Sequence, residues 1–438
     1  METAPLKMIS FLWGVPFISF LMALAVVPLF FQDFWHKNLG KIVVGFSLLI
    51  IVPMLFFLSS ESAQKILFHT LAHNYLPFTI LIATLFILSG GIHITTKGKI
   101  TPFGNVLFLL LGSFLSSFMG TTGASILLIR PFLMMNGQRY HKHYLVIFFI
   151  FTISNIGGCL SPIGDPPLFL GFLNGISFFW PFKCLFQPFV YVMFFLLCVF
   201  YMIDRFYCRG KDFRDEVIDL PEKVKIYGKR NFLGIILVIC ALIFSSLDIP
   251  YIHLMTNVML ILIAVASWVL TPKMVHHMNR FSFEPLREVS LVFLAIFITL
   301  IPIEAMLHLG KEGPLHMIAT LANPQNYPDP LRYYFLTGIL SSFLDNAPTY
   351  LLFFHMLDGI IGGGPAALMT THALTLTALS LGSVFFGALT YIGNAPNLMV
   401  KAMAEHLHVK MPGFIGYMLW SLGILFPILA LFGLYSFR

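Results

Sequence analysis

Charged residues are scarce in this sequence, and the motifs of most enzyme classes are absent. Asp, Glu, Lys and Arg make up 10% of the 438 residues, while 58% are hydrophobic; soluble proteins carry about 25% charged residues. A water-soluble fold could not bury so much apolar surface. There is no GxSxG, HExxH or Walker loop. We therefore expect no enzyme, no cofactor and no ATP-driven pump.

Paired cysteines and basic blocks are also missing. The cysteines show no CxxC spacing and stand mostly in apolar runs, which argues against disulfides and metal clusters; they are Cys159, Cys184, Cys198, Cys208 and Cys240. The net charge is +7, but no block of five or more basic residues occurs, so nucleic acid is not an expected partner.

Long apolar runs fill the sequence instead, and they predict an all-α polytopic membrane protein. The first half (1–203) and the second half (231–438) each hold six runs, and the charged stretch Asp204–Arg230 reads as a solvated linker between them. The predicted runs are Met8–Phe31, Ile42–Ser59, Leu76–Ile94, Phe103–Met135, Tyr144–Trp180 and Leu185–Ile203, then Asn231–Ile249, Leu254–Thr271, Val289–Leu309, Tyr333–Leu357, Ala366–Ala404 and Pro412–Phe437. No cleavage site follows the first run, so it is expected to be retained.

The two halves repeat each other. Leu115–Phe118 and Leu340–Phe343 both read LSSF, and a second set of matches falls on glycine and proline: Gly158, Leu160, Ile163, Gly164 and Pro167 correspond to Gly387, Leu389, Ile392, Gly393 and Pro396. The fourth and fifth runs of each half are too long for one span and are interrupted by polar clusters, which predicts a re-entrant hairpin and a broken helix. Each half then crosses the membrane an odd number of times, so the repeats are inverted.

Loop charges give an orientation. Most of the 26 Lys and Arg residues fall on the face that carries the linker. The positive-inside rule then places the linker in the cytoplasm and both termini outside. The expected location is a bacterial inner membrane.

Three acids stand at membrane depth, where an ionisable group is costly and therefore indicates function. Asp165 and Asp345 lie inside the interrupted segments, and Glu304 lies near the end of its run. Unwound carbonyls, hydroxyls, amides and a carboxylate are the groups that replace the water around a small cation such as sodium. We therefore predict two half-sites for sodium, one at each aspartate.

The predicted half-sites differ in chemistry. In the first, Asp165 stands on the broken helix; in the second, Asp345 stands on the hairpin. The expected ligands are Thr121, Thr122, Ser125, Ser154 and Asn155 with Asp165, and Asn346, Thr349, Asn394 and Asn397 with Asp345. The alternative interpretation is that the hydroxyls and amides only cap the interrupted helices.

Protons are expected to compete for the same carboxylates, because burial penalises their charged form. Glu304 and His93 also fall at related places if Phe86 is matched to Phe297, so they are candidates for proton coupling together with Asp165 and Asp345. A histidine near a span end is otherwise an interfacial hydrogen-bond donor.

The strings Thr152–Gly158, Pro162–Pro167, Asp345–Thr349 and Gly393–Asn397 resemble the ion transporter superfamily, in particular its NhaD-like sodium/proton antiporters and their citrate-transporter-domain relatives. The resemblance runs from about Leu76 to Glu405. It implies an inverted-repeat fold with two re-entrant hairpins, a scaffold part that forms a homodimer and a transport part that moves like an elevator.

The prediction is exchange of sodium, or lithium, for protons. The hairpin tips differ from the Ser-Asn-Thr tips of the dicarboxylate branch, and Asp165 and Asp345 would repel a carboxylate substrate. The alternatives are a sodium-coupled dicarboxylate or citrate symporter, an arsenite-type exporter, and a passive channel, which would need a continuous polar lining. The expected partners are sodium ions, protons and membrane lipids.

Overall fold

The computed structural model describes residues 11–97, 100–209, 222–247, 249–308, 313–324 and 327–438. The start of the first predicted run, part of the linker (210–221) and Leu309 lie outside these ranges. Nine helices among the described residues are long and apolar enough to cross a membrane. The predicted class, an all-α polytopic membrane protein, is confirmed.

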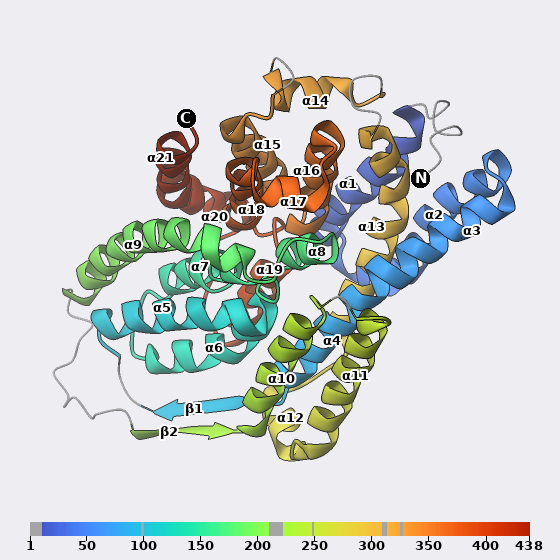
Figure 1. The fold of residues 1–438 in the computed structure, drawn as a ribbon. Helices are drawn as coiled ribbons and strands as arrows, with labels where there is room; N and C mark the ends of the chain where they lie inside the picture. The colour runs from blue at the N-terminus through green and yellow to red at the C-terminus, as the bar shows by residue number, and fades with distance from the viewer. Residues whose placement is uncertain (1–10, 98–99, 210–221, 248, 309–312, 325–326) are drawn as a thin grey trace.

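One group of helices, called the framework here, lies on the right in Figure 1. Within it α13 packs on α1, α2 and α4, and α11 packs on α4 and α10. Its elements are η2 (Phe11–Gly14), α1 (Val15–Phe30), α2 (Gln32–Phe57), α3 (Ser60–His69), η3 (Thr70–Tyr75), α4 (Leu76–Gly90), α10 (Arg230–Phe244), α11 (Ile252–Leu270), α12 (Lys273–Asn279) and α13 (Glu284–His308).

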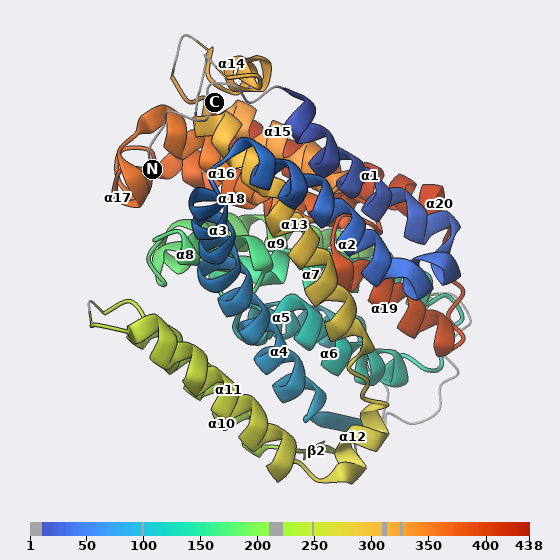
Figure 2. The same ribbon diagram turned by 90° about the vertical axis from the view of Figure 1, so that its right-hand side faces the viewer.

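The second group, called the core, holds both hairpins and both interrupted helices (Figures 1 and 2). The hairpins are α5–α6 and α15–α16, and the interrupted helices are α7–η4–α8 and α18–η7–α19. Its elements are α5 (Pro102–Met119), α6 (Thr121–Met135), α7 (His143–Thr152), η4 (Ile156–Leu160), α8 (Pro166–Leu173), α9 (Trp180–Arg209), α14 (His316–Ala322), α15 (Pro330–Phe343), α16 (Asn346–Ile361), α17 (Gly364–Met369), α18 (Ala373–Phe386), η7 (Gly387–Leu389), α19 (Ala395–His406), α20 (Phe414–Trp420), η8 (Ser421–Leu425) and α21 (Phe426–Ser436).

The third predicted run is longer than expected. Residues Ser60–Gly90 form one helical run through α3, η3 and α4, whereas the hydropathy pattern begins only at Leu76. Ser59 caps the N-terminus of α3, the part that lies outside the predicted run, by accepting a hydrogen bond from the Ser62 amide at 3.2 Å. The exposed ion pair of Glu61 with Lys65 makes this part polar, which explains why an apolar pattern misses it.

The segment His143–Leu160 lies at the centre of the core. It is 94% buried within the protein, while the other eight candidate spans are at most 61% buried. Protein rather than lipid therefore surrounds the break at its end, as backbone without regular hydrogen bonds requires at membrane depth.

The predicted linker is ordered in part. Asp204 is fully buried in α9, which continues to Arg209. Strand β2 (Glu222–Tyr227) pairs antiparallel with β1 (His93–Lys97), and these are the only strands in the described part of the chain. The predicted solvated linker therefore contains the end of α9 and the strand β2, which pairs with β1 from the first half of the chain.

Candidate functional site

The first interrupted helix bends where two glycines meet. Helix α7 ends at Thr152, and the chain turns through η4 before α8 begins at Pro166. A Cβ on Gly164 would overlap the carbonyl of Gly158, so this crossing excludes any side chain. Asp165 then takes extended backbone angles, φ −142° and ψ 141°, as the N-cap of α8.

The second interrupted helix has the same construction. A Cβ on Gly393 would lie 2.6 Å from the carbonyl oxygen of Gly387, and Asn394 is the N-cap of α19 at φ −150° and ψ 136°. The glycine matches in the sequence thus mark one local backbone geometry in both halves.

Serine and threonine hydroxyls tie each break to the neighbouring hairpin. Ser161 donates to the Ser117 carbonyl and accepts from the Ile163 amide. Thr390 donates to the Ser342 carbonyl at 2.5 Å and accepts from the Gly393 amide at 3.0 Å. The site prediction omits these four residues, although the repeated LSSF string already contains Ser117 and Ser342.

Asp165 joins the tips of the two hairpins. Thr121 of α6 donates its hydroxyl to Oδ1 at 3.0 Å, and Asn346 of α16 donates its amide to Oδ2 at 2.9 Å. The Thr121 amide also donates to the Gly164 carbonyl at 2.9 Å. Asp165 is 1% exposed, so both oxygens of this buried carboxylate are held by groups from opposite halves of the chain.

This arrangement differs from the predicted pairing. The prediction placed Asn346 in a separate half-site with Asp345, but its amide group bonds Asp165. The predicted half-sites are therefore not separate, because one bond already crosses between them.

The prolines after Asp165 explain why its side chain is available. An N-cap carboxylate ordinarily accepts from an amide in the first turn of its own helix. Pro166 and Pro167 have no such amide. The amide of Leu168 donates to the main-chain carbonyl of Asp165 at 3.1 Å, and Asp165 makes no side-chain cap bond. Asp345, by contrast, caps its own helix by accepting from the Ala347 amide at 3.1 Å.

The amides behind Asp165 form a network between the interrupted helices. Asn394 donates to the Ser154 carbonyl at 3.2 Å and to Asn155 Oδ1 at 3.1 Å. Asn155 donates to Asn397 Oδ1 at 2.8 Å, and the hydroxyls of Ser125 and Ser154 lie 2.8 Å apart. The bonds of Asn155 to Asn394 and Asn397 cross between the two predicted half-sites, which the prediction kept apart.

Two further predicted ligands have different surroundings. Thr349 donates to the Asp345 carbonyl at 3.1 Å, a bond within its own helical turn. Thr122 lines the cavity described next.

A cavity with an empty volume of about 810 Å³, partly open, lies between the core and the framework. Apolar side chains of α4 and α13 form one wall. The opposite wall carries the N-cap residues of α6, α8, α16 and α19, which are Gly120, Asp165, Asp345 and Asn394. Its described lining contains no Lys, Arg or His.

Four helix N-termini therefore face one cavity. Each carries about half a positive charge, so together they offset roughly the charge of two carboxylates. These dipoles favour the charged form of Asp165 and Asp345 in a site whose described lining has no cationic side chain. The same dipoles favour anionic groups of a substrate.

Glu304 and His93 do not meet. His93 Nδ1 lies 2.6 Å from Asn279 Oδ1, at the end of the framework where α13 begins. Glu304 lies 20 residues, about 30 Å, along α13 from Glu284. It pairs instead with His355 of α16, Oε1 to Nε2, at 2.9 Å. Glu304 and His93 are therefore too far apart for the direct proton exchange that the sequence alignment of the halves suggested.

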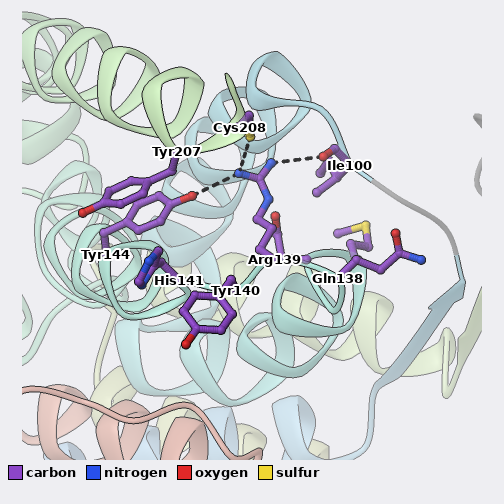
Figure 3. Close-up of a pocket in the computed structure, with 10 residues that line it drawn as sticks. Ile100, Gln138, Arg139, Tyr140, His141, Tyr144, Tyr207 and Cys208 are labelled. Carbon is purple, nitrogen blue, oxygen red and sulfur yellow. Dashed lines mark hydrogen bonds between the residues drawn. The ribbon is translucent and has the colours of Figure 1, made fainter. Parts of the chain in front are cut away.

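A second pocket, shown in Figure 3, surrounds Arg139. Its guanidinium donates to Tyr144 Oη at 3.0 Å, to Cys208 Sγ at 3.0 Å and to the Ile100 carbonyl at 3.2 Å, and it pairs with Asp204. Because the charge is paired with Asp204 and the guanidinium bonds side chains of both helices, we interpret this cluster as a clamp that holds α7 and α9 together.

Comparison with known proteins identifies a family. The model of the family described as putative citrate transport matches residues 6–437, almost the whole chain, so the chain belongs to this family. No curated protein matches the chain. Among the described residues, no cluster of three or more His, Cys, Asp or Glu side chains could hold a metal ion. The family is one of transporters, and the protein is accordingly a multi-pass secondary transporter and not an enzyme.

Proposed function

We propose that this member of the putative citrate transport family exchanges sodium, or lithium, for protons, with Asp165 as the shared binding group. The observation that carries the proposal is the position of Asp165: a buried carboxylate between both hairpin tips, beside a cavity whose described lining has no cationic side chain. Hard cations take oxygen ligands. A proton and a sodium ion would therefore compete for this carboxylate.

Competition is sufficient to couple the two fluxes. A site that binds either sodium or a proton, and that changes the face to which it opens only when occupied, moves one ion against the other. The scheme includes two inverted repeats, an elevator-like movement of the core against the framework, and a homodimeric assembly in a bacterial inner membrane with both termini outside. The shared backbone geometry of the two interrupted helices supports the repeat.

A second candidate is sodium-coupled uptake of citrate or a related carboxylate. The family description and the four N-termini around the cavity favour it. The substrate would have to bring cations, because Asp165 and Asp345 would repel a free polycarboxylate.

Purified protein in liposomes with a trapped pH dye separates the candidates. We expect added sodium or lithium to drive protons across the membrane without citrate, and choline to have no effect. The Asp165→Asn variant should lower this proton flux by about 100-fold or more. If sodium moves no protons while a citrate gradient moves sodium, the exchange proposal is wrong and the second candidate holds.

A further inference from the structure

One basic side chain of each hairpin bonds the framework, in addition to the packing of α6 on α4 and of α16 on α13. Helix α6 contains a single basic residue, Arg130, and α16 contains a single basic residue, His355. Each lies nine residues after the first residue of its helix, Thr121 or Asn346. Counting onward from the repeated LSSF string gives the same match, so the two side chains occupy equivalent places in the two halves.

Both side chains bond the framework, but at opposite ends of it. Arg130 Nη1 donates to the Met278 carbonyl of α12 at 3.0 Å. His355 Nε2 lies 2.9 Å from Glu304 Oε1, in the last turns of α13. The side chains of His355 and Glu304 are 13% and 28% exposed, so water screens this pair only partly.

The two contacts differ in how they respond to protons. An arginine stays charged at any physiological pH, whereas an imidazole loses its charge as pH rises. His355 with Glu304 is an ion pair only while the imidazole is protonated. Once the imidazole is neutral, a weaker hydrogen bond between neutral and charged groups remains.

The described charges around His355 are mainly acidic. Asp358 lies one turn along α16, and its Oδ1 has no hydrogen-bond partner among the described residues. Of the elements packed on α16, helices α8, α17 and α18 contain no ionisable side chain. Helix α15 adds Arg332, which pairs with Asp329, and two buried tyrosines, Tyr333 and Tyr334.

We propose that Arg130 and His355 are equivalent positioning residues that hold α6 and α16 against the framework, and that deprotonation of His355 weakens the contact of α16 with Glu304. The inference rests on the proposed function, because a weaker contact matters for turnover only if the core moves against the framework. Contact at the α6 end is independent of pH and contact at the α16 end is not. Proton concentration at one face then sets how readily the core leaves it.

The pH profile of sodium-driven proton flux tests the inference. His355→Gln should be about threefold faster than the wild type at pH 6 and equal to it at pH 8, because the variant cannot form the ion pair. His355→Lys keeps a permanent charge and should be about tenfold slower at pH 8. Adding Glu304→Gln to His355→Lys should restore the rate. Arg130→Lys is the control: its charge does not titrate, so its profile should follow the wild type in shape.

Thermal unfolding of the wild type and His355→Gln in detergent tests the same contact without transport. A histidine that gains a carboxylate partner stabilises the fold at acidic pH, and this stabilisation is lost as pH rises. We expect the wild type to unfold about 2 °C higher than the variant at pH 6 and at the same temperature at pH 8. Equal temperatures at both pH values, or a His355→Lys, Glu304→Gln double variant as slow as His355→Lys, would overturn the inference. If sodium drives no protons at all, the proposed function fails and the unfolding measurement still decides the contact.

Discussion

The two interrupted helices have the same backbone but opposite chemistry. Asp165 and Asn394 cap their second segments at φ and ψ angles within 10° of each other. One is a carboxylate that accepts from both hairpins, and the other is an amide that donates into the opposite helix. At the hairpin tips the order is reversed, since Gly120 matches Asp345. Each half thus contributes one carboxylate, from a different element.

This difference separates two tasks. Glycine and proline determine the backbone of the hairpins and interrupted helices. This backbone places two helix N-termini from each half at one shared cavity. The N-cap residues at those termini determine which of them carry a carboxylate: Asp165 and Asp345 do, and Gly120 and Asn394 do not. Because the prolines after Asp165 leave its carboxylate uncapped while Asp345 caps its own helix, the two acids are unequal, and their variants should behave unequally.

The largest effect is expected for Asp165→Asn. The substitution removes the charge and places a donor where Thr121 and Asn346 already donate, so sodium-driven proton flux should fall by about 100-fold or more. Flux in liposomes measures this, with far-UV circular dichroism as the folding control. Flux within threefold of the wild type would exclude Asp165 as the shared group.

Asp345→Asn should have a smaller effect, about tenfold on flux, because this carboxylate is already engaged with the Ala347 amide. Asp345→Ser is the matched variant: serine also caps a helix well, so it removes only the charge. If both variants lose flux equally, charge is the cause. If both variants keep wild-type flux, the role of Asp345 is to cap α16, because asparagine and serine both cap a helix well.

Asn394→Asp makes the two interrupted helices alike. The new carboxylate cannot donate to the Ser154 carbonyl or to Asn155 as the amide does, and it adds a third negative charge to the cavity. The site should hold a proton to higher pH. We therefore expect that sodium-driven proton flux increases with pH and that the pH at which the increase begins is about one unit higher in the variant than in the wild type. A flux profile that is unchanged between pH 6 and 9 would show that Asn394 lies outside the ion path.

The sequence predicts the frame better than the contacts. Glycine, proline and the LSSF repeat identify both hairpins and both breaks, because those residues impose local backbone geometry. Partners across the molecule depend on how the halves pack, which no local pattern encodes: Asn346 bonds Asp165, and Glu304 pairs with His355 instead of lying near His93. The sequence repeat already aligns His355 with Arg130. This match would have indicated His355 as a candidate residue.

The prolines after the N-caps allow the smallest and most specific test of the comparison. Pro167→Ala returns an amide to the second position of α8, where an N-cap carboxylate ordinarily binds. Asp165 would then divide its bonds between its own helix and the hairpin tips, and the sodium concentration for half-maximal flux should rise about threefold. Pro396→Ala is the matched control on α19, because a cap bond there would engage Asn394 Oδ1 and leave the bonds of Asp165 to both hairpin tips in place. If both variants shift the half-maximal concentration equally, the prolines act on helix geometry alone, and the availability of the Asp165 carboxylate has another cause.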